Sequence, residues 1–275
     1  MKPRLSRAGI ISIAFVICSA CQLSTKSPAE ATTDARNEPA SIQVVTRKII
    51  DLTHSLAPGI PDFHGDSHAF EYKKSFTVQK DGYASGAISM PEHLGTHVDA
   101  PSHFYDGKES IDQISAQKLI VPCVVLDVRE EVKHDPDYRL SIEKIKSFEQ
   151  GGKIPSNCAV LLLTGWSDRW SNPVSYRNLD AKGVMHFPGF GGESADFLVN
   201  QRHVTALGID TLSTDAGSSD VFPVHKLVLA SGTYMIENLD RLAELPARNA
   251  LLFCGALPIK DGTGSPARIL AVVSE

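Results

Sequence analysis

Three of the ten histidines in this 275-residue chain fall within the eleven-residue segment HLGTHVDAPSH. They are His93, His97 and His103, and Asp99 lies between the second and the third. Neutral imidazole nitrogens and a carboxylate oxygen suit a borderline divalent cation such as zinc or manganese. Three protein ligands leave a coordination position open for water, which distinguishes a catalytic metal site from a closed structural one. The segment therefore predicts a metal centre that does chemistry.

The backbone of this segment must aim the side chains into one cleft. On a helix, His93 and His97 would share a face, but Asp99 would lie about 200° around from His97. Gly95 and Pro101 also disfavour a helix. In an extended chain the odd-numbered ligands lie on one side, so we expect a strand or a tight loop. The alternative is a surface histidine cluster or a set of helix caps, which the absence of lysine from the segment disfavours.

The segment also resembles the signature of the cyclase family of metal-dependent hydrolases, close to H-x-G-T-H-x-D-x-P-x-H. This family includes bacterial kynurenine formamidases and isatin hydrolases. The resemblance runs from about Ile49 to the C-terminus, through DLTH at 51–54, GIDTLSTD at 208–215, and VHKLVL followed by IENL. It implies an α/β fold with a single mixed-sheet domain of the family's swivelling β/β/α type. It also implies a homo-oligomer.

The resemblance implies the metal ligands as well. One divalent ion, zinc or manganese, would be held by His93, His97 and Asp99. A second would be held by Asp99, His225 and Glu237, because in the formamidase branch a His and a Glu twelve residues apart complete the site, as they are here. The cofactor is thus one or two ions per chain.

The implied catalytic residue is His103, which would stay off the metal and exchange protons with water and the leaving nitrogen. Phe63 lies where formamidases often carry an aromatic residue against an aryl substrate. The chain would then hydrolyse a small aryl formamide or cyclic amide, resembling N-formylkynurenine or isatin, with metal-activated water attacking the carbonyl. The alternative is a non-catalytic metal- or solute-binding exported lipoprotein, which would not need His103.

Residues 1–20 predict an export signal, with a basic start, an apolar run at 8–18 and small residues at the end. Cys21 then occupies the position of a bacterial lipoprotein's lipidated cysteine, although Cys18 stands where Leu, Val or Ile is usual. Residues 21–45 contain no aromatic residue and predict a flexible tether. We therefore expect a hydrolase domain at 46–275, exported to the periplasm or anchored to a membrane through Cys21.

Composition limits the partners of that domain. The net charge is −5 and no basic stripe is present, so we expect a small-molecule substrate, no nucleic acid, and membrane contact only through the N-terminal anchor. No G-x-S-x-G elbow supports a serine nucleophile. Cys123, Cys158 and Cys254 lie in apolar runs and are expected to be buried strand residues.

Apolar runs rich in β-branched residues predict buried strands at 120–128, 158–164, 204–209, 250–255 and 268–273. Periodic patterns predict helices at 141–150, with Ser141 as the N-cap, at 192–200, and at 238–245. Asp51 and His54 are expected in a strand-end turn. Asp210 and Asp215 either orient histidine ligands or form turns.

Overall fold

The computed structural model of the protein describes residues 48–273. The export signal, Cys21 and the tether lie outside these residues and stay predictions. Within residues 48–273, no helix has the length and apolar character needed to cross a membrane.

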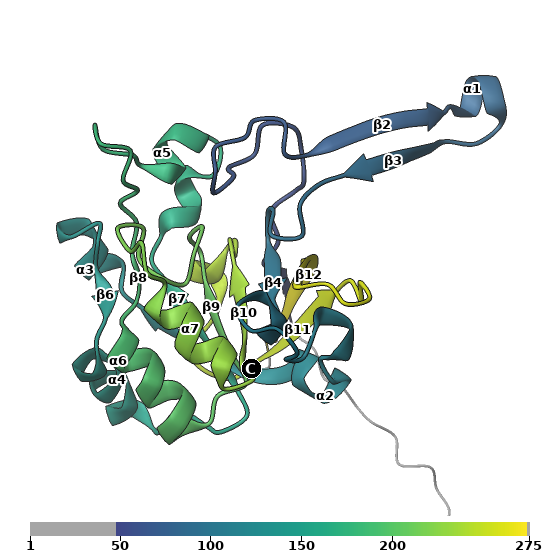
Figure 1. Cartoon of the computed structure of the whole chain (residues 1–275). Coiled ribbons are helices and arrows are strands. Elements are labelled where there is room, and N and C mark those ends of the chain that lie inside the picture. Colours follow the sequence, from purple (N-terminus) through teal and green to yellow (C-terminus); the bar gives the residue numbers. More distant parts are fainter. Residues whose placement is uncertain (1–47, 274–275) are drawn as a thin grey trace, which may run out of the picture. The chain divides into compact units, whose positions relative to one another are not determined.

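One mixed sheet of eight strands forms the centre of the fold (Figure 1). Its strand order is β1-β12-β11-β5-β7-β9-β10-β4, and β4 also pairs with β12, which closes the sheet into a barrel. Strands β5, β7, β9 and β10 run parallel, and the other pairs are antiparallel. The strands are β1 (Lys48–Asp51), β4 (His97–Asp99), β5 (Ile120–Asp127), β7 (Ala159–Leu163), β9 (Ala206–Ile209), β10 (Tyr234–Glu237), β11 (Ala250–Ala256) and β12 (Gly264–Val273). The predicted mixed α/β class is confirmed.

The central strands are apolar throughout because both of their faces are buried. In β5, Cys123 and Val125 belong to the core cluster inside the barrel, whereas Val124 and Leu126 pack in a second cluster with the helices. Those helices include α4 (Ile142–Phe148), α6 (Gly192–Asp196) and α7 (Pro223–Ala230). The three cysteines of the described residues are buried, as expected, and none of them forms a disulfide.

Shorter elements connect these layers. A hairpin of β2 (Glu71–Phe76) and β3 (Ser85–Ser89), joined by α1 (Val78–Asp81), extends away from the sheet (Figure 1). The remaining elements are the helices and turns η1 (Pro101–His103), η2 (Ile111–Gln113), α2 (Ala116–Leu119), α3 (Arg129–His134), η3 (Glu149–Gly151), η4 (Trp166–Arg169), α5 (Pro173–Arg177), η5 (Phe197–Gln201) and η6 (Leu242–Glu244), and the strands β6 (Arg139–Leu140) and β8 (Gly189–Phe190).

The predicted helix at 238–245 is wrong, because only a short 3₁₀ turn forms there at Leu242–Glu244. Asn238 and Arg241 have left-handed φ angles of 55° and 53°, which a right-handed helix does not allow. The buried Asn238 amide donates to the Gly95 carbonyl at 2.9 Å. A tertiary contact with the predicted metal-binding segment thus overrides the local periodicity.

Other boundaries differ less. The last strand begins at Gly264 rather than 268, because residues 264–266 pair with β4. The helix at 192–200 is α6 followed by a π-helical turn. Ser141 is an N-cap as predicted, since its hydroxyl accepts from the Lys144 backbone N–H. Helix α7 and strand β10, which carry two predicted ligands, were not predicted from the sequence.

Candidate metal and catalytic site

The predicted ligands converge at the closure of the barrel. Strand β4 carries His97 and Asp99, and Glu237 at the end of β10 is the register partner of His97. His225 comes from the first half of α7. Asp99 lies between them: its Oδ1 is 3.2 Å from His97 Nε2, and its Oδ2 is 3.5 Å from His225 Nε2. All four side chains are buried.

The two buried histidines, His97 and His225, have ring orientations compatible with metal binding. His97 Nδ1 donates to the Gly95 carbonyl at 2.9 Å, and His225 Nδ1 donates to Asp215 at 2.7 Å. With Nδ1 protonated, each neutral ring presents the Nε2 lone pair to the centre. Metal-bound histidines typically donate their other ring N–H to a carbonyl or carboxylate in this way. Asp215 also accepts from the backbone N–H of His225, so both roles weighed for it, orientation and turn formation, apply.

A buried carboxylate oxygen without a hydrogen-bond partner indicates that a cation fits this arrangement. Asp99 Oδ2 is buried and has no hydrogen-bond partner in the protein, an arrangement that is costly without a compensating charge. Ligand atoms of His97, Asp99 and Glu237 lie within 4.8 Å of one another, as do those of His93, Asp99 and His103. Nitrogen and carboxylate donors of this kind suit a divalent metal.

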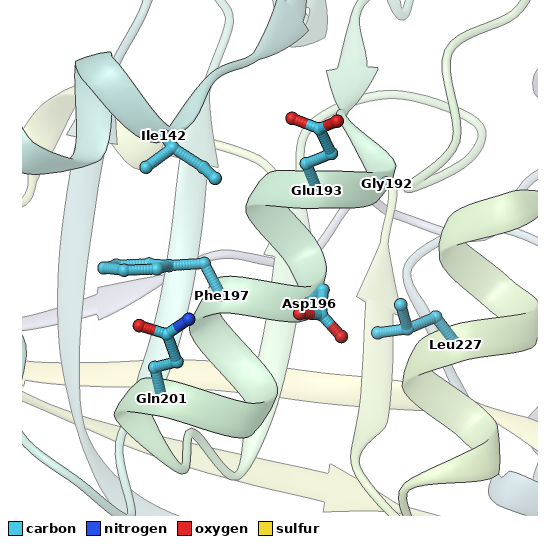
Figure 2. A pocket seen from close by; sticks show the side chains of 7 residues that line it. All are labelled: Ile142, Gly192, Glu193, Asp196, Phe197, Gln201 and Leu227. Atoms are coloured by element: carbon cyan, nitrogen blue, oxygen red, sulfur yellow. The ribbon is translucent and has the colours of Figure 1, made fainter.

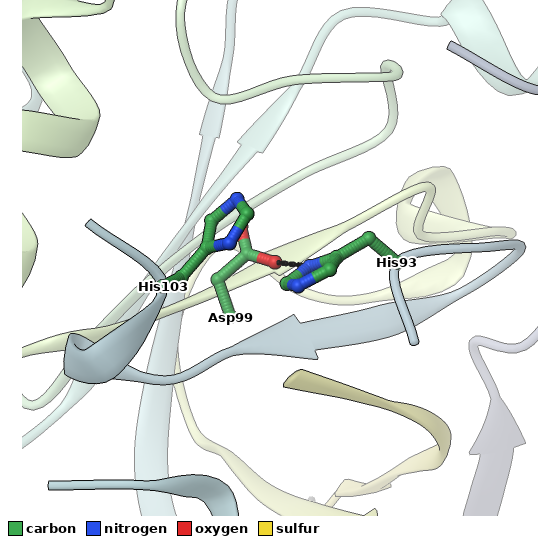
Figure 3. A group of neighbouring side chains, drawn as sticks. All are labelled: His93, Asp99 and His103. Atoms are coloured by element: carbon green, nitrogen blue, oxygen red, sulfur yellow. Dashed lines mark hydrogen bonds and ion pairs between the residues drawn. The ribbon is translucent and has the colours of Figure 1, made fainter. Parts of the chain in front are cut away.

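His93 and His103 lie on either side of Asp99 (Figure 3). His93 precedes β4 and places Nδ1 2.5 Å from Asp99 Oδ1, whereas His103 ends the 3₁₀ turn η1. The two rings stack with centroids 3.9 Å apart. Among the described residues, His103 forms no ion pair with a carboxylate of the cluster, although its ligand atom lies within 4.8 Å of those of His93 and Asp99. Its role away from the metal stays a prediction.

Burial and charge act differently on these histidines. Burial opposes the charge on His97, but Asp99 and Glu237 outweigh it and raise the pKa of His97 to about 9. Burial likewise opposes the charge on His225, but its hydrogen bond to Asp215 and the nearby carboxylates of Asp99 and Glu237 raise its pKa to about 10. Burial lowers the pKa of His103 to about 4, so that ring is neutral at pH 7.

These pKa directions predict proton release on metal binding. The raised pKa values of His97 and His225 favour their protonated forms at pH 7 when no metal is bound, and burial raises the pKa of Glu237 to about 7. A cation must then displace about two to three protons per site. Metal affinity should therefore rise with pH and fall as pH is lowered. Calorimetric titration in buffers of different ionisation enthalpy counts the protons, and a heat that does not depend on the buffer would contradict this linkage.

A pocket of about 350 Å³ opens onto the ligands. The predicted Phe63 lines it, together with Phe104 and Phe222, which the sequence did not single out. The Phe222 ring lies 6.2 Å from Phe63 and 5.9 Å from Phe104 between centroids. His103 also lines this pocket, so the candidate acid–base faces an aromatic chamber.

The remaining sequence candidates lie elsewhere. Asp51 binds Arg268 at the end of β1, as a strand-end residue, and buried His54 stacks on Trp170 at 3.9 Å. Asp210 accepts from the backbone N–H groups of Thr164 and Gly165 instead of orienting a ligand. These residues stabilise turns and packing outside the site.

A second hollow on the surface lies beside α6 and α7 (Figure 2). Its seven lining residues include no histidine, cysteine or lysine, and they are Ile142, Gly192, Glu193, Asp196, Phe197, Gln201 and Leu227. We assign no chemistry to it.

Comparison with known proteins decides the family. The family model described as "Putative cyclase" matches residues 50–216. The chain belongs to the cyclase family. The predicted resemblance is thereby confirmed, and the mixed barrel is the one found in structures of cyclase-family proteins.

Two curated relatives and one solved structure show where in the cyclase family this chain falls. The isatin hydrolase of Roseibium aggregatum is 32% identical, over 82% of this chain and 92% of its own length. The kynurenine formamidase of Geobacillus thermodenitrificans is 27% identical, over 80% of this chain and 94% of its own length. The structure of isatin hydrolase A from Labrenzia aggregata bound to benzyl benzoate superposes with a TM-score of 0.78 at 36% identity, covering 83% of this chain and 94% of that one.

This cyclase-family chain is a metal-dependent hydrolase, and the prediction that it is an enzyme is confirmed. The alternative of a non-catalytic binding lipoprotein finds no support, because the named relatives are enzymes that hydrolyse amides. The donor set points to a divalent metal at the convergence of β4, β10 and α7.

Proposed function

We propose that this protein opens a small, neutral cyclic aryl amide of the isatin class by hydrolysis. The observation that carries the proposal is the aromatic pocket over the metal ligands. Three phenylalanines line it, and none of its lining residues is a lysine or an arginine. The isatin hydrolases similar to this chain support the same substrate class.

The charge of the pocket favours isatin over N-formylkynurenine. At neutral pH N-formylkynurenine carries an α-carboxylate and an α-ammonium group, and an α-carboxylate in this pocket would find no lysine or arginine among the lining residues. Burying an unpaired charge is expensive. When metal is bound and His97 is neutral, the acidic side chains of the lining are Asp62, Asp99 and Glu237, and no cationic side chain is present to pair with a substrate carboxylate. A neutral, flat substrate avoids this penalty and stacks on the aromatic walls.

In the proposed reaction, water adds to the amide carbonyl, the C–N bond breaks, and a carboxylate and an aryl amine result. A divalent ion held by His93, His97, Asp99, His225 and Glu237 supplies an acidic, carbonyl-polarising centre when bound. Neutral His103 accepts the proton of the attacking water and then donates it to the leaving nitrogen. The phenylalanine walls hold the ring and exclude bulk water.

The ion would be zinc or manganese, and one or two ions would bind per chain. Both carboxylate oxygens of Asp99 face different histidines, since Oδ1 faces His93 and His97 while Oδ2 faces His225. Such a carboxylate can serve one ion or lie between two. Elemental analysis of the purified protein gives both the identity and the number.

A substrate panel tests the proposed preference. Metal-loaded protein should show a higher kcat/KM for isatin than for N-formylkynurenine, because only the latter brings an unpaired carboxylate into the pocket. A His103→Ala preparation assayed in parallel controls for contaminating hydrolases. A kcat/KM for N-formylkynurenine that exceeds the value for isatin would contradict this preference and indicate a formamidase.

We also propose that the chain forms a homo-oligomer through the β2–β3 hairpin. Every residue of both strands is exposed, including Tyr72 at 56% and Ile88 at 60%. A lone two-stranded hairpin is marginally stable in water and gains from a covering surface. Its three lysines outnumber its two acids, whereas the whole chain has a net charge of −5, so a second copy offers complementary charge.

Charged substitutions on this hairpin should reduce the oligomeric state. The double variant Tyr72→Lys with Ile88→Lys removes apolar contact area and adds repulsion, so it should sediment as a smaller species than the wild type. Val174→Lys, at an apolar residue that is 82% exposed elsewhere, is the matched control and should sediment as the wild type does. A wild-type protein that sediments as a monomer at micromolar concentration would contradict the proposal.

A further inference from the structure

Two residues outside the metal-binding segment contact His93 through a chain of hydrogen bonds. His93 Nε2 lies 2.9 Å from Thr263 Oγ1, and Thr263 Oγ1 lies 2.6 Å from Glu92 Oε2. The Thr263 backbone N–H also donates to Glu92 Oε2 at 3.1 Å. Glu92 precedes His93 in the sequence, whereas Thr263 lies 170 residues away, just before β12.

Which group donates in each of these hydrogen bonds follows from counting the available protons. A carboxylate only accepts, so the single hydroxyl proton of Thr263 is donated to Glu92. The Thr263 oxygen is then left to accept, and its remaining partner is His93 Nε2. His93 Nε2 must therefore donate to Thr263. Nδ1 lies 2.5 Å from Asp99 Oδ1, which likewise only accepts, so without metal Nδ1 donates to Asp99, and a bound metal would take the place of that proton.

Close backbone packing holds the ring in this position. A Cβ atom at Gly264 would lie 2.5 Å from His93 Cε1 and 2.6 Å from the Val98 carbonyl oxygen, so the ring rests against the bare backbone of β12. Gly264 is also the register partner of Asp99. The position of Thr263 is thereby fixed relative to both His93 and the ligand strand.

We propose that Glu92 and Thr263 are positioning residues that set the tautomer of His93, so that His93 binds the metal through Nδ1. His97 and His225 have the opposite arrangement, with Nδ1 protonated and Nε2 facing the centre. The inference rests on the proposed metal site and is independent of the substrate. It assigns functions to an acidic residue and a threonine that carry no ligand role themselves.

Nitrogen NMR of the whole protein tests the tautomer directly. With ¹⁵N-labelled histidine and zinc as the only added ligand, long-range ¹H–¹⁵N correlations show which ring nitrogen is protonated and which is metal-bound. His93→Gln identifies the signals of that ring. We expect His93 to be protonated at Nε2 and bound at Nδ1, and His97 and His225 to show the reverse. Coordination of His93 through Nε2 would overturn the proposal.

Substitutions test whether the hydrogen bonds between Glu92, Thr263 and His93 select this tautomer of His93. Thr263→Val should lower zinc affinity by about 10–100-fold, the usual size for losing an outer partner of a ligand. Thr263→Ser should restore it. Glu92→Gln should also stay close to wild type, because the amide oxygen can accept from both Thr263 groups, whereas Glu92→Ala should weaken zinc binding. Affinity is read by competition with a chromophoric chelator.

Each alternative outcome has a distinct meaning. Wild-type zinc affinity in Thr263→Val, or equal losses in the Val and Ser variants, would overturn the proposal. Thermal unfolding of the metal-free variants shows whether they fold, and the wild-type NMR result decides the matter if Thr263→Val does not. A wild-type protein that binds zinc as described but leaves isatin intact would contradict only the proposed substrate.

Discussion

Replacing His103 by alanine should lower kcat for isatin opening by about 10²–10⁴, the usual loss for a general acid–base. The metal content should stay at the wild-type level, because His103 forms no ion pair with Asp99 or Glu237, whereas His97 and His225 face both carboxylates. An amide nitrogen leaves poorly without a proton, so amides should suffer more than activated aryl esters. Steady-state kinetics on both substrate types and elemental analysis of the same preparations measure these effects.

His186→Ala is the matched control for that substitution. His186 is also a histidine beside a carboxylate, with Nδ1 2.6 Å from Asp137, but it lies outside the pocket lining. It should keep wild-type turnover. Loss of metal in His103→Ala would show that His103 is a ligand, and an unchanged amide rate would show that another group transfers the proton.

Replacing Asp99 by asparagine should remove most of the bound metal, and activity with it. The substitution keeps the shape of the side chain but removes the charge that three histidines face. The loss of affinity should exceed the roughly 10–100-fold typical of an outer-partner substitution. Chelator competition and elemental analysis after dialysis provide the measurement.

Asp215→Asn supplies the comparison for an outer partner. Asp215 contacts His225 Nδ1 at 2.7 Å, so its substitution disturbs one ligand without removing it. We expect a loss of about 10–100-fold, smaller than that of Asp99→Asn. Equal metal affinity in wild type and Asp99→Asn would rule out Asp99 as the central ligand.

The sequence was most informative where the site is local. His93, His97, Asp99 and His103 lie within eleven residues, so their types and spacing were enough to predict a metal centre. His225 and Glu237 came only from the family resemblance, because nothing near them in the sequence marks them as ligands. Parallel pairing of β9 with β10 and antiparallel pairing of β10 with β4 bring Glu237 opposite His97, and such long-range pairing leaves no local signal.

Residues that act through tertiary contacts were the least predictable. Thr263 lies in the segment KDGTGSPAR at 260–268, in which no residue signals a role at the site, and its contact with His93 depends on β12 closing against β4. Asn238 begins a pattern that favoured a helix, yet its side chain is needed at the Gly95 carbonyl. Phe104 directly follows His103, and this adjacency was the one available signal that it would line the pocket.

Metal titration of isatin turnover tests the central claim most directly. Protein stripped by a chelator is mixed with isatin, and substrate loss is followed as zinc or manganese is added in steps. We predict no turnover without metal, and a rate that rises with added metal to a plateau at one or two equivalents per chain. Full turnover by the stripped protein, or no turnover at saturating metal, would contradict a metal-dependent hydrolase of this substrate class.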